Sequence, residues 1–524
     1  MSQQYRASPE FTVIHDTSSI VSIDSTSTES TGTSTPEQTQ PLSTAFQTGS
    51  FVKKSHIRSY QTSARSEIRL HKGSGSGTTT RGPDVVAYLL DAAVLLVKAK
   101  AKWVRGYEQY EVYKEPIPLL QLSISSSPVS DRPSLSRALS RMILHGKSSL
   151  EDKQTLLLTR LGTNGFTKTF FATSTTQLAE FLAAIKQRQK ELVARFDRHF
   201  SKTVIIPAVR DRIQCLLPVE RKGKILYGTA SGLYILDRGS TSELSRQVLD
   251  TKHVKQIERF GDGGYLVLAN RRLLLYTADS IIKENNEKGA QSQPKGHLVH
   301  NGAVDFYKSG IGLGRELVCA VKTSPLSTTI YVYKTDKPGF AGKVQHNTIL
   351  FRKYNIPTEA YSVHFLRSTL CIGCARGFEV LSLETADLVS QSLLDQADTS
   401  LDFAQRAKIL ITPIDMQRLN GEFLLNYREF SFFVNRNGWR SRPDFLIRWE
   451  GAPVSFVLQY PYIIAFGSRL IEVAHVVKGK MEWVTVGKDI RMVFSSPGEV
   501  LIVQEDDAGH DVVIRLDMFL IPTS

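Results

Sequence analysis

The chain has 524 residues, a formal net charge of +14 and 41% hydrophobic residues, so it is too long for one ordinary domain and can bury a sizeable core. Its longest apolar runs fall short of the roughly 20 residues that a bilayer core requires, its first residues lack a signal-peptide pattern, and its four cysteines exclude a disulfide framework. We therefore expect a cytoplasmic protein. Its charge favours an acidic protein face or anionic lipid as partner and not nucleic acid, because no nucleic-acid-reading motif is present.

The N-terminal part of the chain is dominated by Ser and Thr, turns basic after about residue 50, and ends in the Gly/Ser-rich stretch GSGSGTTTRG. Such a composition buries too little apolar surface to offset chain entropy. We predict a disordered tail over residues 1–66 and a β-strand at Glu67–Leu70.

A small β-domain is predicted at residues 67–197. The stretch VVAYLLDAAVLLVKAK indicates two strands around Asp91, YEQYEVYKEPIPLLQLSI indicates another strand and a proline-marked turn, and TLLLTRLG and TKTFFATS indicate two more strands. A polar insert at about residues 125–153 interrupts this pattern. From Thr175 the apolar residues recur at i, i+3, i+4 and i+7, which predicts an amphipathic helix that continues toward Phe196.

Several strands closed by one C-terminal helix are the layout of a pleckstrin-homology (PH) domain. The segments DVVAYLLDAAVLLVK and YEVYKEPIPL and the helix ending IKQRQ resemble the PH domain of fungal Rho guanine-nucleotide exchange factors. Two features depart from this pattern. Phe181 stands where PH domains usually carry Trp, and Gly/Ser-rich sequence stands where the first two strands are expected, before Asp84.

A group of basic residues is the candidate phosphoinositide site of this PH-like domain, because lysine and arginine pair readily with phosphate groups. A solvated hairpin loop is the alternative, and the degenerate first hairpin favours it. The candidate residues are Arg69, Lys72, Lys98, Lys100, Lys102 and Arg105.

The remaining residues, 198–524, repeat one unit seven times: an apolar strand, a tight polar turn and a second strand, as in KILYGTASGLYILD and YIIAFGSRLIEVAHV. The copies begin about 40 to 55 residues apart, which is the spacing of four-stranded propeller blades. Independent β-sandwiches would not keep one hairpin pattern through seven copies. We therefore predict a seven-bladed β-propeller, with Val204–Pro207 or Ile213–Leu217 completing the last blade, and a mainly β protein overall.

The propeller lacks the WD dipeptide of the commonest repeat family. Its segments FRKYNIPTEAYSVHFLRSTLCIGCARGFEVLSLET and FLLNYREFSFFVNRNGWRSRPDFLIRWEG resemble the citron homology (CNH) domain, over about residues 205–520. This resemblance implies a protein-interaction module of the kind found on Rho exchange factors, certain protein kinases and vesicle-tethering proteins.

The sequence offers no constellation of catalytic residues, so we expect no catalytic site, no cofactor and no metal. Its glycine clusters lack the lysine and the strand–loop–helix context of a phosphate-binding loop. Histidines such as His364 stand singly. Cys371 and Cys374 lack a second pair of zinc ligands and are interpreted as core residues.

One polar turn of the propeller places an aromatic residue among arginines, which is the composition of an interface hot spot. Its candidate partner-binding residues are Arg436, Trp439, Arg440 and Arg442. A structural turn with Trp439 packed inward explains the same residues, and both alternatives stay open.

The resemblance also implies a function. In the exchange-factor family a helical Dbl-homology (DH) domain before the PH domain expels the nucleotide, whereas the tail predicted here shows no helical periodicity. We expect a non-catalytic scaffold in Rho-type small GTPase signalling, with a Rho-type GTPase as its partner. The alternative is a phosphoinositide-directed adaptor, peripheral at the plasma membrane, whose propeller recruits a kinase or a vesicle-tethering protein.

Overall fold

The computed structural model describes residues 66–72, 85–104, 107–128, 154–162, 165–172, 174–196, 200–219, 223–261, 263–282, 294–335, 348–385, 390–405 and 411–518. The chain divides into two units, Met1–Val52 and Lys53–Ser524, and every described residue belongs to the second. The tail predicted at residues 1–66, except for its last residue, and most of the predicted insert lie outside the described residues. None of the described helices is long and apolar enough to cross a membrane.

The N-terminal part of the described chain is one antiparallel sheet with the strand order β4-β3-β2-β1-β8-β7-β6, in which β5 also pairs with β3. Pairing of β1 with β8 brings the first and last strands side by side. Helix α3 (Thr175–Phe196) buries Leu178, Phe181 and Ile185 in the core of this sheet. The strands are β1 (Ser66–Lys72), β2 (Val85–Leu89), β3 (Ala93–Val104), β4 (Tyr107–Val112), β5 (Ile117–Pro118), β6 (Leu122–Pro128), β7 (Gln154–Arg160) and β8 (Phe166–Ala172), with the short helix η1 (Leu119–Gln121).

The strand predicted at Glu67–Leu70 is confirmed by β1, and the expectation that Gly/Ser-rich sequence replaces both of the first two strands before Asp84 is therefore wrong for the first of them. Strand β1 is present from Ser66 and pairs antiparallel with β2 from Ser66 to Leu70, so the Gly/Ser-rich stretch follows the first strand and connects it to the second. Phe181 is fully buried and fills the core position at which a Trp was expected.

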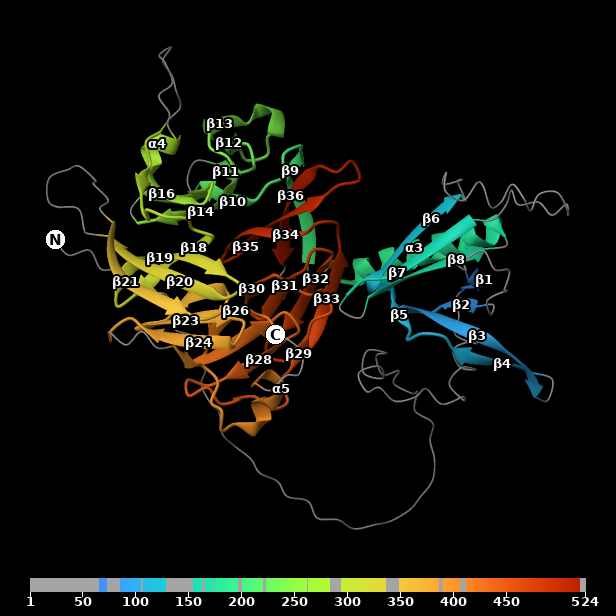
Figure 1. Ribbon diagram of the computed structural model, residues 1–524. Coiled ribbons are helices and arrows are strands. Elements are labelled where there is room, and N and C mark those ends of the chain that lie inside the picture. Colours follow the sequence, from blue (N-terminus) through green and yellow to red (C-terminus); the bar gives the residue numbers. More distant parts are fainter. Residues whose placement is uncertain are drawn as a thin grey trace, which may run out of the picture. The chain divides into compact units, whose positions relative to one another are not determined.

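The C-terminal part of the described chain is a seven-bladed β-propeller, as predicted (Figure 1). Each blade is an antiparallel sheet of four strands. We number the blades along the chain: blade 1 is β10 (Cys215–Val219), β11 (Lys224–Gly228), β12 (Leu233–Asp237) and β13 (Arg246–Leu249); blade 2 is β14 (Val254–Phe260), β15 (Gly264–Ala269), β16 (Arg272–Thr277) and β17 (His297–Leu298); blade 3 is β18 (Phe306–Gly312), β19 (Arg315–Ser324), β20 (Ser327–Thr335) and β21 (Thr348–Ile356).

The remaining blades follow the same order. Blade 4 is β22 (Ala360–Phe365), β23 (Thr369–Cys374), β24 (Gly377–Ser382) and β25 (Gln391–Ser392); blade 5 is β26 (Pro413–Leu419), β27 (Glu422–Tyr427), β28 (Phe430–Val434) and β29 (Ile447–Arg448); blade 6 is β30 (Ser455–Gln459), β31 (Tyr462–Phe466), β32 (Leu470–His475) and β33 (Lys480–Val486); blade 7 is β34 (Arg491–Ser496), β35 (Glu499–Glu505), β36 (Asp511–Met518) and β9 (Phe200–Val209). The short helices η3 (Ser242–Leu244), α4 (Ala278–Ile282), η4 (Thr399–Leu401) and α5 (Asp402–Gln405) lie in connections.

The seven predicted hairpins form the second and third strands of the blades. Within the described chain, each of the seven junctions between neighbouring blades has its own buried hydrophobic cluster, including the junction between blade 7 and blade 1. A single blade therefore cannot bury its own apolar faces, and the blades stabilise one another through nearest-neighbour contacts.

Closure of the ring joins two distant parts of the chain. Strand β9 pairs antiparallel with β36, so a segment near residue 200 supplies the fourth strand of the last blade (Figure 1). Of the two predicted closing strands, Val204–Pro207 lies in this strand, whereas residues 215–217 begin the first strand of blade 1.

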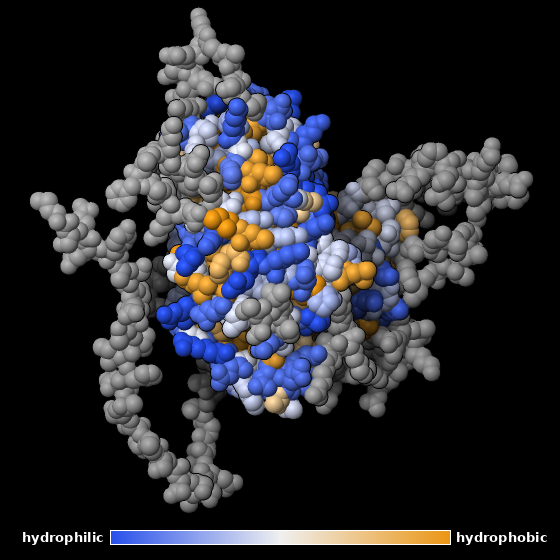
Figure 2. Space-filling view, turned by 60° about the vertical axis from the view of Figure 1, so that its left-hand side comes forward, coloured by the Kyte–Doolittle hydropathy of each residue, from blue (hydrophilic) through white to orange (hydrophobic). Residues whose placement is uncertain are grey.

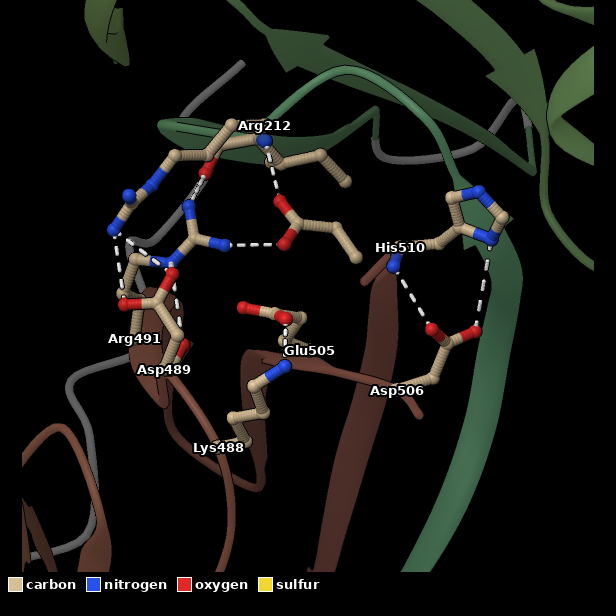
Figure 3. Close-up of polar contacts among 9 residues, drawn as sticks. Arg212, Lys488, Asp489, Arg491, Glu505, Asp506 and His510 are labelled. Atoms are coloured by element: carbon tan, nitrogen blue, oxygen red, sulfur yellow. Dashed lines mark hydrogen bonds and ion pairs between the residues drawn. The ribbon is translucent and has the colours of Figure 1, made fainter. Parts of the chain in front are cut away.

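Polar contacts reinforce this closure between blade 7 and the segment that leads into blade 1 (Figure 3). Asp511 is 5% exposed, and its carboxylate accepts the Ile213 N–H at 2.6 Å and an Arg491 Nη2 hydrogen bond at 2.5 Å. Arg491 also donates to the Ile213 carbonyl oxygen. Arg212 forms an ion pair with Asp489 at 2.8 Å. We call Asp511, Arg491 and the Ile213 backbone the closure clasp.

Replacing Asp511 with Ala leaves the buried Ile213 N–H without its acceptor and removes the carboxylate that pairs with Arg491. We expect Asp511→Ala to lower the free energy of unfolding by about 3 kcal/mol, measured from the midpoint of urea unfolding. Asp507 is exposed on the turn that precedes β36 and provides the matched control, since Asp507→Ala should change stability by less than about 0.5 kcal/mol. Equal effects of the two substitutions would show that the clasp does not stabilise the ring.

Candidate partner-binding surface

The predicted polar turn lies between β28 and β29 in blade 5. The Asn435 side chain accepts hydrogen bonds from the backbone N–H groups of Asn437 at 2.9 Å and Trp439 at 3.1 Å. Gly438 has a φ of 80°, and a Cβ there would lie 2.1 Å from the carbonyl oxygen of Leu393. The turn therefore requires glycine at this position, both for its left-handed backbone and for its close approach to the segment after blade 4.

Trp439 lies at the surface of this turn with 43% of its area exposed. Its indole Nε1–H donates to Asp395 at 3.0 Å, which fixes the orientation of the ring. Arg436, on the same turn, is also exposed. An exposed aromatic ring that is held in place loses little entropy on binding, which suits a protein-binding anchor.

Arg440 supports the fold of the same turn. Its backbone N–H donates to Asp398 at 2.8 Å, and its guanidinium lies 5.2 Å from the centroid of the Phe403 ring. Burial raises the pKa of the Asp398 carboxyl, but hydrogen bonds from Ser400 and Arg440 outweigh burial and hold that pKa below its usual value. Asp398 therefore remains an ionised acceptor that ties blade 4 to blade 5.

Arg442 is likewise half-buried in the fold. Its Nη2 forms an ion pair with Glu422 at 2.5 Å, and its guanidinium lies 3.8 Å from the Phe433 ring centroid. Burial alone would raise the pKa of Glu422, but the hydrogen bonds and the charge of Arg442 keep this pKa below its ordinary value of 4.5. The ion pair is thus fully formed at neutral pH.

The four candidate residues therefore divide into two pairs. Trp439 and Arg436 are exposed, whereas Arg440 and Arg442 are engaged in the fold. We call Trp439 and Arg436 the tryptophan surface. Its role in binding a partner stays a prediction. Trp439 does not pack inward, as the alternative of a structural turn expected, whereas Arg440 and Arg442 do have the structural role of that alternative.

Stability measurements separate these two pairs. Arg442→Ala should lower the free energy of unfolding by about 2 kcal/mol at pH 7, because it removes a half-buried ion pair, whereas Arg436→Ala should have almost no effect. Because the folded pKa of Glu422 is depressed, the stabilisation from the pair is present above pH 4.5 and is lost as the pH falls through the folded pKa. The difference between wild type and Arg442→Ala should accordingly shrink in acid, and a difference that is constant with pH would contradict this assignment.

The candidate phosphoinositide residues do not all share one face of the sheet. In the sheet, Lys98 pairs with Val85, and Val85 pairs in turn with Leu70. Val85 and Leu70 face the core, so Lys98 lies on the core side of the sheet. Arg69 pairs with Val86 in the neighbouring register, so it lies on the opposite face. The Lys98 ammonium lies 4.5 Å from the centroid of the Tyr113 ring. Lys72, Lys100 and Lys102 lie in β1 and β3, but their side chains and the whole of Arg105 lie outside the described residues.

His364 has partners that the sequence did not reveal. Its Nε2 lies 3.0 Å from the Ser362 hydroxyl, and its Nδ1 lies 3.6 Å from Asp415 on the next blade. These residues line a cavity of about 390 Å³. Burial, opposed by Asp415, lowers the pKa of His364, which favours the neutral ring at pH 7. The distance of 3.6 Å exceeds that of a hydrogen bond, and Asp415 instead accepts from Gln417 at 2.5 Å, so we interpret the group as a polar contact between blades.

Cys371 and Cys374 are both buried in β23. Burial raises the pKa of each thiol, which disfavours the thiolate that metal binding or redox chemistry would need. Among the residues that the structure describes, no group of His, Cys, Asp and Glu side chains is placed to hold a metal ion.

Comparison with known protein families agrees with this architecture. The family model of the CNH domain matches residues 221–496, which cover the greater part of the propeller. This chain belongs to the CNH domain family. The family model of the pleckstrin homology domain matches residues 66–189, so both resemblances inferred from the sequence are confirmed.

The chain is also similar to individual proteins. It is 34% identical to the Rho1 guanine nucleotide exchange factor 1 of Schizosaccharomyces pombe over 454 residues, which are 82% of this chain and 33% of that protein. It is 24% identical to human citron Rho-interacting kinase over 282 residues, 50% of this chain and 13% of the kinase. The solved structure of the AfRom2 CNH domain is 47% identical, with a TM-score of 0.55, and covers 61% of this chain and 100% of that domain. The chain thus spans about a third of the length of the exchange factor.

Proposed function

We propose that this PH and CNH region acts as a non-catalytic scaffold in Rho-type GTPase signalling and binds a Rho-type GTPase through the tryptophan surface. One observation carries the proposal. The exchange factor and the kinase are different kinds of protein, yet both names refer to Rho, and each is similar to part of this chain, which belongs to the CNH domain family. An interaction with Rho that is common to both proteins is therefore expected to involve a part of this chain.

The non-catalytic part of the proposal is supported by the described architecture. In the Rho exchange factors that this chain resembles, nucleotide exchange is assigned to an elongated helical bundle. In the described part of this chain, α3 is the one helix longer than five residues, and it is committed to the core of the PH domain. The propeller supplies rigid turns, which suit partner binding.

Purified chain should capture an immobilised Rho-type GTPase without accelerating release of a fluorescent guanine nucleotide from it. We expect Trp439→Ala to weaken capture about tenfold, in line with the loss of an aromatic hot spot. Leu244→Ala, which also truncates an exposed hydrophobic residue but lies in blade 1, is the matched control and should leave capture unchanged.

Three results would contradict the proposal. Acceleration of nucleotide release by catalytic amounts of the chain would overturn its non-catalytic role. Absence of capture would overturn the choice of a Rho-type GTPase as partner. Equal losses of capture for Trp439→Ala and Leu244→Ala would show that the binding site is not at Trp439. Thermal unfolding of each variant shows that the fold is retained.

The phosphoinositide adaptor is the second candidate function, and one backbone observation favours it. Lys98, Lys100 and Lys102 all belong to the one strand β3, in which Lys98 and Lys100 pair with Glu111 and Gln109 of the neighbouring β4. Vesicles of phosphatidylcholine that contain phosphatidylinositol bisphosphate should pellet the chain if this strand meets lipid. Charge reversal of Lys98, Lys100 and Lys102 should then abolish pelleting, and pelleting that survives the reversal would exclude this site.

A further inference from the structure

A second surface lies in the propeller, where blade 2 meets blade 3. A cavity of about 430 Å³ opens beside the turn between β15 and β16 and is closed by the segment that follows β17. Arg271 and Arg272 line one wall, and His300 and Asn301 line another. Four residues that can carry charge or donate hydrogen bonds therefore converge on one concave space.

Arg271, one of the two arginines that line the cavity, is held in place by contacts within the propeller. Arg271 occupies the left-handed region with a φ of 60° in a two-residue turn. Its guanidinium forms an ion pair with Asp305 at 2.9 Å, and the other oxygen of Asp305 accepts the Thr323 N–H of blade 3 at 3.0 Å. The Arg271 carbonyl oxygen accepts the Val304 N–H at 2.9 Å. This chain of contacts connects the turn of blade 2 to the β19–β20 hairpin of blade 3.

His300 is an aromatic lining residue of the cavity and is 9% exposed. Its Nδ1 lies 2.7 Å from the hydroxyl of Tyr333, and its ring centroid lies 4.3 Å from that of Tyr331. Burial, and then the charge of Lys322, lower the pKa of His300, so this ring is neutral at pH 7. His300 thus holds the wall in place, and the charge of the site comes from other residues.

That charge is positive. Arg272 lines the cavity and is exposed, and Lys322 is exposed and close enough to affect the His300 ring. Lys353 is also exposed and lies 5.6 Å from the centroid of the Tyr331 ring. Asp305, the carboxylate that meets this wall, is already bonded to Arg271 and Thr323. Among the residues that the structure describes, no carboxylate pairs with Arg272 in the cavity or with the nearby Lys322, so both can bind an external anion.

Apolar surface adjoins these cations on blade 3. Leu326, at the tip of the β19–β20 hairpin, is 84% exposed, and Ile349 and Leu350 of the outer strand β21 are also exposed. β21 lies at the left of Figure 1, the side that Figure 2 brings forward, where hydrophobic residues gather among hydrophilic ones. Cations beside exposed aliphatic side chains match a protein segment that carries both carboxylates and apolar residues.

We propose that this cavity binds an acidic peptide segment of a second partner protein, whose carboxylates pair with Arg272 and Lys322 and whose apolar side chain packs on Leu326. Nucleic acid is disfavoured, because His300 and Tyr333 are buried and cannot stack on bases.

The cavity is separate from the tryptophan surface. It lies beside hairpins that join the second and third strands of blades 2 and 3, whereas the turn of Trp439 joins the third and fourth strands of blade 5. In an antiparallel blade these two kinds of turn lie at opposite ends of the strands. The two surfaces therefore do not compete for one partner.

The probe for this site is a short fluorescein-labelled peptide of glutamates around two leucines, titrated with the full chain by fluorescence anisotropy. Arg272→Glu with Lys322→Glu should weaken binding at least about tenfold, since two exposed ion pairs become repulsive. Arg315→Glu with Arg367→Glu is the matched control. It makes the same change in net charge on exposed residues at the first turns of blades 3 and 4 and should weaken binding less than about twofold.

Two single variants and a vesicle experiment test the proposal further. Leu326→Ser should weaken peptide binding, and Trp439→Ala should leave it unchanged, which separates this proposal from the proposed GTPase interaction. Equal losses of peptide affinity for the two double variants would show that the peptide binds through non-specific charge attraction, and would overturn the proposal. Phosphatidylserine vesicles that bind through Arg272 and Lys322, while the peptide does not, would replace the peptide site with a lipid site.

Discussion

Pairing of β9 with β36 is the interaction on which the rest of the propeller depends. Seven blades that bury their faces only against neighbours leave two apolar faces exposed unless the first and last blades meet. The chain solves this problem with a strand from before blade 1, a buried cluster at the junction of blades 7 and 1, and the closure clasp around Asp511. The clasp adds charge-assisted hydrogen bonds, which specify register in a way that apolar packing alone does not.

A closed ring also explains how one chain presents two surfaces. The tryptophan surface depends on Asp395 and Asp398, which come from the segment after blade 4 and hold a turn of blade 5. The cavity depends in the same way on Asp305, which connects blade 2 to blade 3. Both sites are built from contacts between neighbouring blades, so each is rigid only while the ring is intact. This dependence is the physical basis of the proposed scaffold role.

Local periodicity allowed much of the fold to be predicted. The two central strands of each blade are apolar and joined by short polar turns, and α3 carries a clear helical stripe, so all of these were predicted. The outer strands β17, β25 and β29 have only two residues each and leave no readable pattern. Strand β1 was predicted at Glu67–Leu70, but the Gly/Ser-rich sequence after it gave no sign that it is the first strand of the PH domain. Exposure was not predictable either: Trp439 and Arg442 stand three residues apart, yet only contacts with distant residues, Asp395 and Glu422, decide which of them reaches the surface. The cavity could not be predicted, because its lining residues Arg272 and His300 are far apart in sequence.

The central claim is that the propeller binds two partners at once through separate surfaces. The most direct measurement is retention of the labelled acidic peptide by the chain when the chain is itself captured on an immobilised Rho-type GTPase. We predict that the captured chain retains the peptide with unchanged affinity, because the two surfaces lie at opposite ends of the blades. Displacement of the peptide by saturating GTPase, with both partners bound singly, would contradict the claim and place them on one surface.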